Sequence, residues 1–187
     1  MLTLRPENLP VIPEILEIDD DLVLRQFDVF DDIALFKLAN RNRAELARYR
    51  GLIGIETYDD CARSITIRRQ AAEEGQACWF GIFFQEKLVG NVCAVNLHQP
   101  VYRATLSYWL DREYWGRGLA TRSVERLIQF LFDVYQVPEV RIYCERENLP
   151  SVRLAERSGF KRFRPNLDQR SDNTLDYVWF RRRHHRP

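Results

Sequence analysis

The stretch SYWLDREYWGRGLATRSVERLIQFLFD, residues 107–133, decides the fold, because its hydrophobic pattern changes in the middle. Its first residues complete the run YRATLSYWL, residues 102–110, whose composition is typical of a strand. After the turn WGRG, apolar residues recur at spacings of three and four, at Ala120, Val124, Leu127, Ile128, Leu131 and Tyr135. This period predicts an amphipathic helix, so a strand, a glycine-bearing turn and a helix follow one another.

Upstream of this unit, the pattern predicts a β-hairpin preceded by helices. Residues 76–84 and 88–98 are predicted to be two strands joined by a turn at 85–87. The sequence TYDD, residues 57–60, is typical of a capping box that opens a helix. Residues 22–27 are predicted to form a further strand, followed by two shorter helices.

Downstream, residues 139–145 are predicted to form a strand, 150–158 a short helix, and 159–163 and 175–182 two final strands. Most strands are linked as hairpins, whereas the strand–helix–strand unit at 104–144 requires a parallel pair. The expected fold class is therefore α/β, of the mixed α+β kind: a central mixed, mostly antiparallel sheet with one parallel pair, flanked by helices.

A chain of 187 residues is long enough to bury a core without disulfide or metal support. We expect a single domain over residues 1–187, with its core at about 22–182. Residues 1–20 form a proline-rich lead-in without a clear period, and residues 183–187 form a basic tail.

Composition excludes several classes of protein. Apolar residues make up 45% and charged residues 29% of the chain, so it is not disordered, collagen-like or a coiled coil. With 28 basic and 27 acidic residues the net charge is +1, and no specific nucleic acid partner is expected. The charge is uneven, however: residues 1–60 carry −6 and residues 141–187 carry +6, so the basic part could face an anionic ligand.

The sequence favours a cytoplasmic protein without a membrane partner. No uncharged stretch is long enough to span a bilayer, and prolines and acids occupy the N-terminus where a signal peptide is basic and apolar. The four cysteines have no CxxC spacing, and Cys78, Cys93 and Cys144 lie in apolar runs, which indicates reduced, buried thiols. No spacing of His, Cys and Asp predicts a metal site.

The turn at residues 115–120 is a candidate phosphate site. A helix N-terminus offers unpaired N–H groups and a partial positive charge, and Gly116, Gly118 and Ala120 leave room for an anion to approach them. The turn matches neither the Walker A loop nor the Rossmann fingerprint. Taken alone, a glycine pair that opens a helix is more often a tight turn than a ligand site.

A second motif, ENLPSVRLAERSGF at residues 147–160, follows the strand at 139–145. Asn148 comes after the strand, and Pro150 suits the first turn of a helix. Ser151 would then project from the helix start near the end of that strand. From spacing alone, the simpler interpretation is that Asn148 and Ser151 cap the helix.

Together, residues 107–133 and 140–163 resemble the GNAT superfamily of N-acetyltransferases. The similarity is greatest to the RimJ/RimL-type branch, which includes ribosomal-protein N-terminal acetyltransferases, and it covers roughly residues 22–182. The resemblance implies acetyl-CoA as co-substrate, a primary amine as acceptor, and a parallel strand pair that splays apart.

The resemblance also implies site residues. Backbone N–H groups of the turn would hold the coenzyme A pyrophosphate, and the positions that match are Trp115, Gly116, Arg117, Gly118, Leu119, Ala120 and Thr121. The pantetheine would lie in the opening between the splayed strands, against Leu110. Asn148 would contact the cofactor, and Ser151 would lie near the thioester sulfur. Tryptophan at the first position departs from the general pattern but is usual in this branch.

The expected chemistry is direct attack of a neutral amine on the thioester. A backbone N–H at a bulged strand near Tyr108 would stabilise the oxyanion, and Ser151 could relay a proton to the leaving thiolate. The general base is not evident, because residues 102–106 contain no carboxylate. His98 titrates in a suitable range, although a histidine at a strand end is more often incidental. We expect α-amino groups rather than lysine side chains as acceptors.

Two alternatives stay open at the level of sequence. The chain could be a catalytically silent coenzyme-A-binding sensor, or a ribosome- or RNA-associated binding protein that uses its basic tail. A ribosomal or other protein N-terminus is a possible partner, and the chain could be a monomer or a homodimer. In the family, segments matching about 40–58 and 166–174 choose the acceptor.

Overall fold

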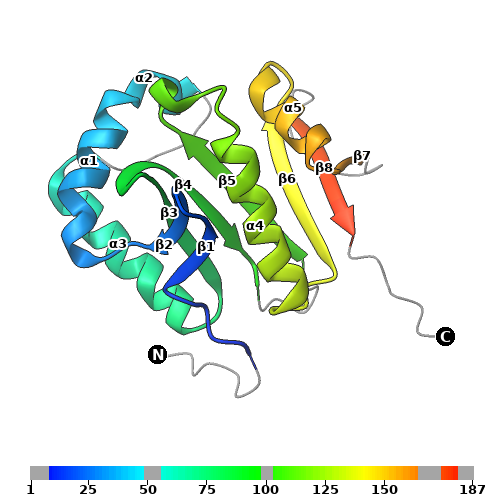
Figure 1. Cartoon of the computed structure of the whole chain (residues 1–187), viewed down its shortest axis with the longest axis horizontal. Coiled ribbons are helices and arrows are strands. Elements are labelled where there is room, and N and C mark those ends of the chain that lie inside the picture. Colours follow the sequence, from blue (N-terminus) through cyan, green and yellow to red (C-terminus); the bar gives the residue numbers. More distant parts are fainter. Residues whose placement is uncertain (1–8, 49–55, 98–102, 164–173, 181–187) are drawn as a thin grey trace.

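The protein is described by a computed structural model over residues 9–48, 56–97, 103–163 and 174–180. In this part of the chain eight strands form one sheet, in the order β1-β2-β3-β4-β5-β6-β8-β7 (Figure 1). The strands are β1 (Ile15–Asp19), β2 (Leu22–Gln26), β3 (Ala77–Phe84), β4 (Lys87–Val95), β5 (Arg103–Leu110), β6 (Glu139–Glu145), β7 (Lys161–Phe163) and β8 (Thr174–Phe180).

All neighbouring strands are antiparallel except β5 and β6, which are parallel. Their pairing runs only from Arg103 opposite Glu139 to Leu106 opposite Ile142. Both strands continue beyond these residues without pairing to each other, so they diverge. The expected fold class, with one splayed parallel pair, is confirmed.

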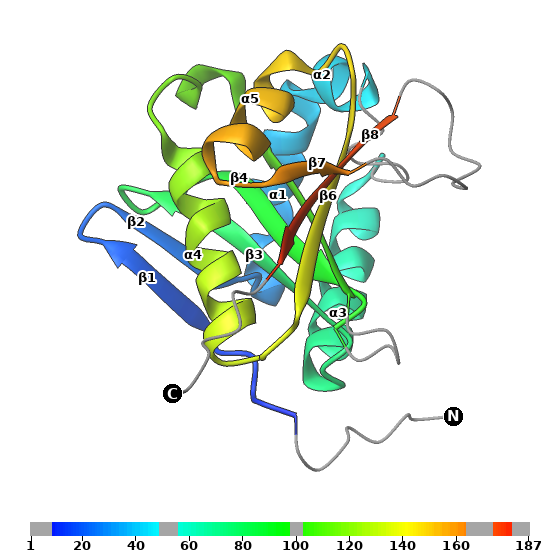
Figure 2. The ribbon, with the colours of Figure 1, turned by 90° about the vertical axis from the view of Figure 1, so that its right-hand side faces the viewer.

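Helices cover both faces of the sheet (Figure 2). Helices α4 and α5 lie on one face, and α1 to α3 lie on the other. Their bounds are η1 (Val29–Asp31), α1 (Asp32–Arg41), α2 (Arg43–Arg48), α3 (Tyr58–Glu73), η2 (Arg112–Tyr114), α4 (Leu119–Asp133) and α5 (Leu149–Arg157). Within the described ranges, no helix is long and apolar enough to cross a membrane.

The two faces have separate hydrophobic cores. The larger core joins α4 to the sheet and contains Leu127, Leu131 and Val140. The apolar positions predicted for this helix at 124, 127, 128, 131 and 135 are all buried. The smaller core lies under α1 and α3 and consists of Phe27, Leu35, Cys61 and Ile65. Strands β3, β4 and β5 therefore present alternate side chains to the two cores.

The predicted capping box sets the start of α3. The Thr57 hydroxyl accepts from the Asp60 N–H at 3.2 Å, and the Asp60 carboxylate accepts from the Thr57 N–H at 2.8 Å. The Thr57 hydroxyl also donates to the Asp60 carboxylate at 2.8 Å, and this bond, followed by those from the Glu56 and Thr57 N–H groups, lowers the pKa of Asp60 to about 2. Helix α3 is thus fixed at its N-terminus, and its buried residues Cys61 and Ile65 belong to the smaller core.

One expectation about the N-terminal region is wrong. Residues 15–19 of the supposed lead-in form the edge strand β1, and Ile12 and Leu16 are buried in the larger core. The core therefore begins before residue 22. The strand lacked a visible period because Leu16 is its only buried side chain, as is common at a sheet edge that faces solvent. Residues 1–8 and 181–187 lie outside the described part.

Candidate active site

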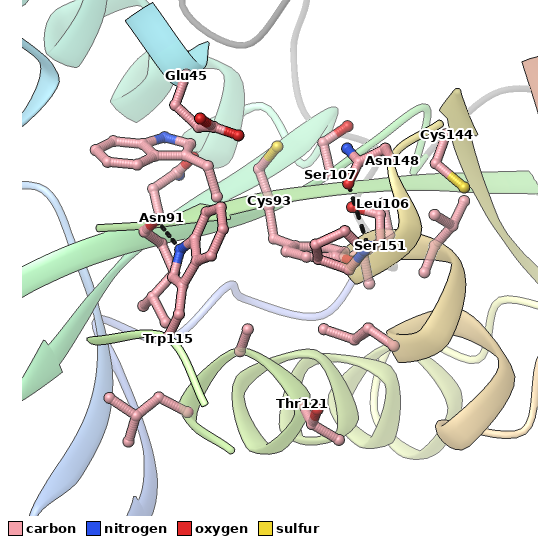
Figure 3. A pocket seen from close by; sticks show the side chains of 18 of the residues that line it. Glu45, Asn91, Cys93, Leu106, Ser107, Trp115, Thr121, Cys144, Asn148 and Ser151 are labelled. Carbon is pink, nitrogen blue, oxygen red and sulfur yellow. Dashed lines mark hydrogen bonds between the residues drawn. The ribbon is translucent and has the colours of Figure 1, made fainter. Parts of the chain in front are cut away.

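The divergence of β5 and β6 opens into a cavity of about 780 Å³. One wall comes from the ends of β5 and β6, the turn before α4, and the start of α5. The opposite wall comes from α2, α3, β3 and β4 (Figure 3). The cavity therefore connects the two faces of the sheet, which we call the α4 face and the α3 face.

Strand β5 divides its side chains between these faces. Leu106 is part of the larger core, and Tyr108 and Leu110 pack against it, so they lie on the α4 face. Trp109 packs against the smaller core, on the α3 face. All four residues line the cavity, together with Ser107. Strand β5 thus separates the two faces, and molecules bound on either face would both contact it.

The turn before α4 is built to receive an anion. Gly116 and Gly118 have φ values of +77° and +73°, a conformation that favours glycine. A Cβ atom at either position would meet no atom within 4 Å, so the turn faces open space. The helix begins without a side-chain cap or an acidic residue, and its first backbone bond runs from the Arg122 N–H to the Gly118 carbonyl at 3.0 Å. The N–H groups of residues 119–121 are left for a ligand.

Side chains beside this turn hold it in place. The Trp115 indole N–H donates to the Leu110 carbonyl at 2.8 Å and ties the turn to the end of β5. Arg157 donates to the Thr121 hydroxyl at 3.3 Å and adds positive charge at the helix start. The predicted site residues here that line the cavity are Leu110, Trp115, Gly116, Gly118, Leu119, Ala120 and Thr121.

The side chain of Arg117, a residue predicted to bind the cofactor through its backbone N–H, is not brought to the cavity. It lies over the Tyr114 ring, 5.1 Å from the ring centre, and is not among the cavity-lining residues. Only its backbone remains available for the predicted contact. Arg122 is likewise engaged, in an ion pair with Asp19.

The end of β5 presents free backbone groups to the opening. The Asp111 N–H donates across to the Val89 carbonyl of β4 at 2.8 Å. Because N–H groups alternate in direction along a strand, those of Tyr108 and Leu110 point the other way, toward the diverging β6. The expected bulge near Tyr108 is wrong: β5 keeps a regular register with β4, and the irregularity lies between β3 and β4, at Ile82 and Phe83. Divergence of the strands alone exposes these groups.

At the start of α5, the side chain that caps the helix and the hydroxyl that faces Tyr108 belong to different residues. The Asn148 side chain caps the helix by accepting from the Ser151 N–H at 3.2 Å (Figure 3). The Ser151 hydroxyl does not cap; it lies beside the buried Tyr108 hydroxyl, which has no well-formed hydrogen bond in the described structure. Burial raises the pKa of Tyr108 far above its usual value, and the Ser151 hydroxyl opposes that rise. Both side chains line the cavity.

The wall on the α3 face was not predicted residue by residue, although Glu45 lies in the segment at about 40–58 that the resemblance assigns to the acceptor. It consists of Glu45 from α2, Arg68 from α3, Trp79 from β3, Asn91 and Cys93 from β4, and Trp109 from β5. These residues come from five separate elements, so no contiguous motif marks them. The one signal in the sequence is Asn91, a polar residue inside an otherwise apolar strand.

The remaining predicted groups have different outcomes. His98 lies outside the described residues. The four cysteines are buried and unpaired with one another, as expected. Burial, reinforced by the Glu156 charge, raises the pKa of Cys144 to about 11, so its thiol stays protonated near neutral pH although it lines the cavity. Among the described residues, no group of three or more His, Cys, Asp or Glu is placed to hold a metal.

Comparisons with known proteins agree with this geometry. A family model described as an acetyltransferase (GNAT) domain matches residues 21–161. The chain is 28% identical over 121 residues to the N-acetyltransferase p20 of Bacillus licheniformis. This alignment covers 63% of this chain and 67% of that protein. It is 25% identical over 147 residues to the putative ribosomal N-acetyltransferase YdaF of Bacillus subtilis. This alignment covers 77% of this chain and 80% of YdaF.

A solved structure shows how far the fold is shared. The RimL ribosomal α-N-protein acetyltransferase in complex with coenzyme A superposes with a TM-score of 0.81. The match covers 89% of this chain and 98% of that one, at 21% identity. The family match spans three quarters of the chain and includes both the glycine turn and the start of α5. This chain belongs to the GNAT family of acetyltransferases, whose co-substrate is acetyl-CoA.

Proposed function

We propose that this acetyltransferase moves the acetyl group of acetyl-CoA directly to an α-amino group, in a complex that holds both substrates at once. The observation that carries the proposal is the cavity that joins the α4 face to the α3 face through the opening between β5 and β6. A thioester entering from one face and an amine entering from the other would meet beside Tyr108.

The α4 face fits acetyl-CoA. The N–H groups of residues 119–121 would bind the pyrophosphate, and the glycine turn leaves room for it. The pantetheine would extend a backbone pairing along the free edge of β5, using the N–H groups of Tyr108 and Leu110. Asn148 would contact the cofactor while it caps α5. The Tyr108 or Leu110 N–H would also stabilise negative charge on the thioester oxygen.

The proton transfers can be assigned to side chains at the cavity. Glu45 and Glu145 are the two carboxylates that line the cavity, and Glu45, from α2, would take the proton that the amine loses as the C–N bond forms. As the C–S bond breaks, the leaving thiolate would receive a proton from the Ser151 hydroxyl. Because the pKa of Tyr108 is raised, its hydroxyl keeps its proton and would hold Ser151 by a hydrogen bond, while solvent in the cavity would return the proton to Ser151.

The acceptor is best assigned to the α-amine class. An α-amine has a pKa near 8, against about 10.4 for lysine, so a single carboxylate or a water chain is enough to deprotonate it. Relatives with names that refer to ribosomal-protein acetylation support an acceptor at a protein N-terminus. A small amine remains an alternative acceptor, and either a monomer or a homodimer would suit the reaction. Four unpaired cysteines fit action in the reducing cytoplasm.

The test is thiol release from acetyl-CoA across a panel of N-terminal peptides, polyamines and amino sugars. We expect release with α-amines, and mass spectrometry should locate the acetyl group on the first residue of the peptides. Acetyl groups mainly on lysine side chains would contradict the proposed acceptor class. Tight binding of coenzyme A without release for any acceptor would instead support the sensor.

A further inference from the structure

The α3 face of the cavity contains a cation without an acidic partner. Arg68 lines the cavity from α3, and its Nη1 atom is buried without a hydrogen-bond partner in the described structure. Its guanidinium lies 5.8 Å from the centre of the Phe27 ring and 5.9 Å from that of Trp79. None of the ion pairs found among the described residues includes Arg68.

A second donor without a partner lies on the same wall. The indole N–H of Trp109 is also buried, and it has no hydrogen-bond partner within the described part of the chain. Trp109 lines the cavity and packs against the smaller core together with Trp79. A guanidinium and an indole N–H can only donate hydrogen bonds. Both groups therefore call for an acceptor that the described residues do not provide.

The surroundings of Arg68 explain why the missing acceptor should be anionic. Burial lowers the pKa of Arg68, and the groups that counter this effect are the Cys93 and Cys61 thiols rather than a carboxylate. Both thiols have raised pKa values of about 11 and stay neutral near pH 7. An isolated buried charge is costly, and pairing with an opposite charge offsets the cost.

We propose that the acceptor carries an anionic oxygen group, a carboxylate or a phosphate, in addition to its amine, and that Arg68 binds this group with help from the Trp109 N–H. This inference rests on the proposed function, because it names the substrate class of the same cavity. The amine would lie toward Glu45 and Tyr108, and the anionic group toward Arg68. The centres of the Trp79 and Phe27 rings lie 5.9 Å and 5.8 Å from the planar guanidinium, whose fork of donors can present two N–H groups to one anion.

The experiment uses matched acceptor pairs that differ only in the anionic group. One set is tripeptide amides with Asp or Asn at the first, second or third position, and the other is O-phosphoethanolamine against ethanolamine. For wild type, kcat/KM for at least one anionic acceptor should exceed that of its neutral partner by about tenfold or more. In Arg68→Gln the ratio should fall to near one, and Arg68→Lys should retain part of it. Which set responds identifies the source of the anion.

Arg63→Gln is the matched control, because Arg63 lies on the same helix but is 70% exposed and pairs with Asp60. It should keep the wild-type ratio. A melting midpoint for Arg68→Gln close to or above that of wild type shows that the variant folds. If transfer occurs but the ratio is near one in wild type for every pair, or unchanged in Arg68→Gln, the anionic subsite is overturned and the proposed function stands.

Calorimetry with the protein–coenzyme A complex tests the anionic subsite independently of acetyl transfer. The same tripeptide amides and O-phosphoethanolamine serve as probes. Binding that is lost in Arg68→Gln, without acetyl transfer to any acceptor, would support the anionic subsite and overturn the proposed function. No binding of any anionic probe, together with no transfer, would overturn both.

Discussion

The two walls of the cavity are made in different ways. On the α4 face, the groups assigned to acetyl-CoA are mostly backbone N–H groups, held by two glycines with positive φ and by the start of a helix. On the α3 face, the groups are side chains from five elements, including Glu45, Arg68 and Trp109. Backbone groups recognise a ligand that every member of a family shares, whereas side chains can change with the acceptor.

This difference also separates the effects of mutation. Substitutions on the α4 face should change cofactor affinity, and those on the α3 face should change the reaction with the amine. Ser151 lies at the junction, because its backbone belongs to the capped start of α5 and its hydroxyl lies beside Tyr108.

The largest effect is expected for Glu45→Gln, which removes the carboxylate that α2 contributes to the cavity. Turnover with an α-amine acceptor should fall by about 100-fold at pH 7, with little change in coenzyme A affinity. The deficit should shrink as the pH rises past about 8, because the amine then loses its proton to solvent. Steady-state kinetics from pH 6.5 to 9.5 measure this.

Glu125→Gln is the control for that experiment, since Glu125 is an exposed carboxylate on the other side of the sheet. It should behave like wild type. Normal turnover of Glu45→Gln at pH 7 would remove Glu45 from the mechanism.

Ser151→Ala should reduce turnover by about 10- to 100-fold and leave cofactor affinity almost unchanged. The melting midpoint should also be maintained, because the cap of α5 is the Asn148 side chain and the Ser151 N–H, both retained. Asn148→Ala removes that cap and should instead cost about 1 kcal/mol of stability. A lower midpoint with normal turnover in Ser151→Ala would show that its role is structural.

Gly118→Val tests the α4 face. A Cβ atom at this position projects into open space where the phosphates should approach, and φ is +73°, so coenzyme A affinity should fall by roughly tenfold. Gly75→Val is a matched control, since Gly75 also has a positive φ, of +69°. Gly75 lies just after the C-terminal end of α3 and does not line the cavity. It should lose stability and keep its affinity. Equal affinities for Gly118→Val and wild type, measured by calorimetry, would mean that the turn binds nothing.

The smallest effect is expected for Cys144→Ala. Its thiol has a pKa of about 11 and stays protonated at neutral pH, so transfer should not pass through an acylated cysteine. Turnover should stay within about twofold of wild type, and alkylation of Cys144 should accelerate about tenfold per pH unit until about pH 11. A loss of turnover comparable to that of Ser151→Ala would indicate a covalent step.

The same difference between the walls explains how much could be predicted from the sequence. The glycine turn and α4 were predictable, because one contiguous stretch carries both the period of Leu127 and Leu131 and the residues that face the opening. Two glycines do not reveal which way the side chain between them points, so the position of the Arg117 side chain over the Tyr114 ring could not be predicted.

On the α3 face, the resemblance indicated only the segment at about 40–58, and the other residues could not be predicted because they meet only in the folded sheet. Glu45 and Trp109 are 64 residues apart, and nothing local to either one indicates a shared cavity. Strand β1 was missed for a related reason: an edge strand with one buried side chain, Leu16, has no period to detect. Both features, the α3 face of the cavity and strand β1, depend on packing between segments that are distant in the sequence.

The division between the two faces is tested most directly by following backbone amide resonances as coenzyme A is added to the isotope-labelled protein. The largest shifts should appear at Gly118, Leu119, Ala120 and Thr121, with further changes at Tyr108 and Leu110. The amides of Arg68 and Trp79 should move least. Shifts concentrated on the α3 face, or none at the start of α4, would contradict the assignment of acetyl-CoA to the α4 face.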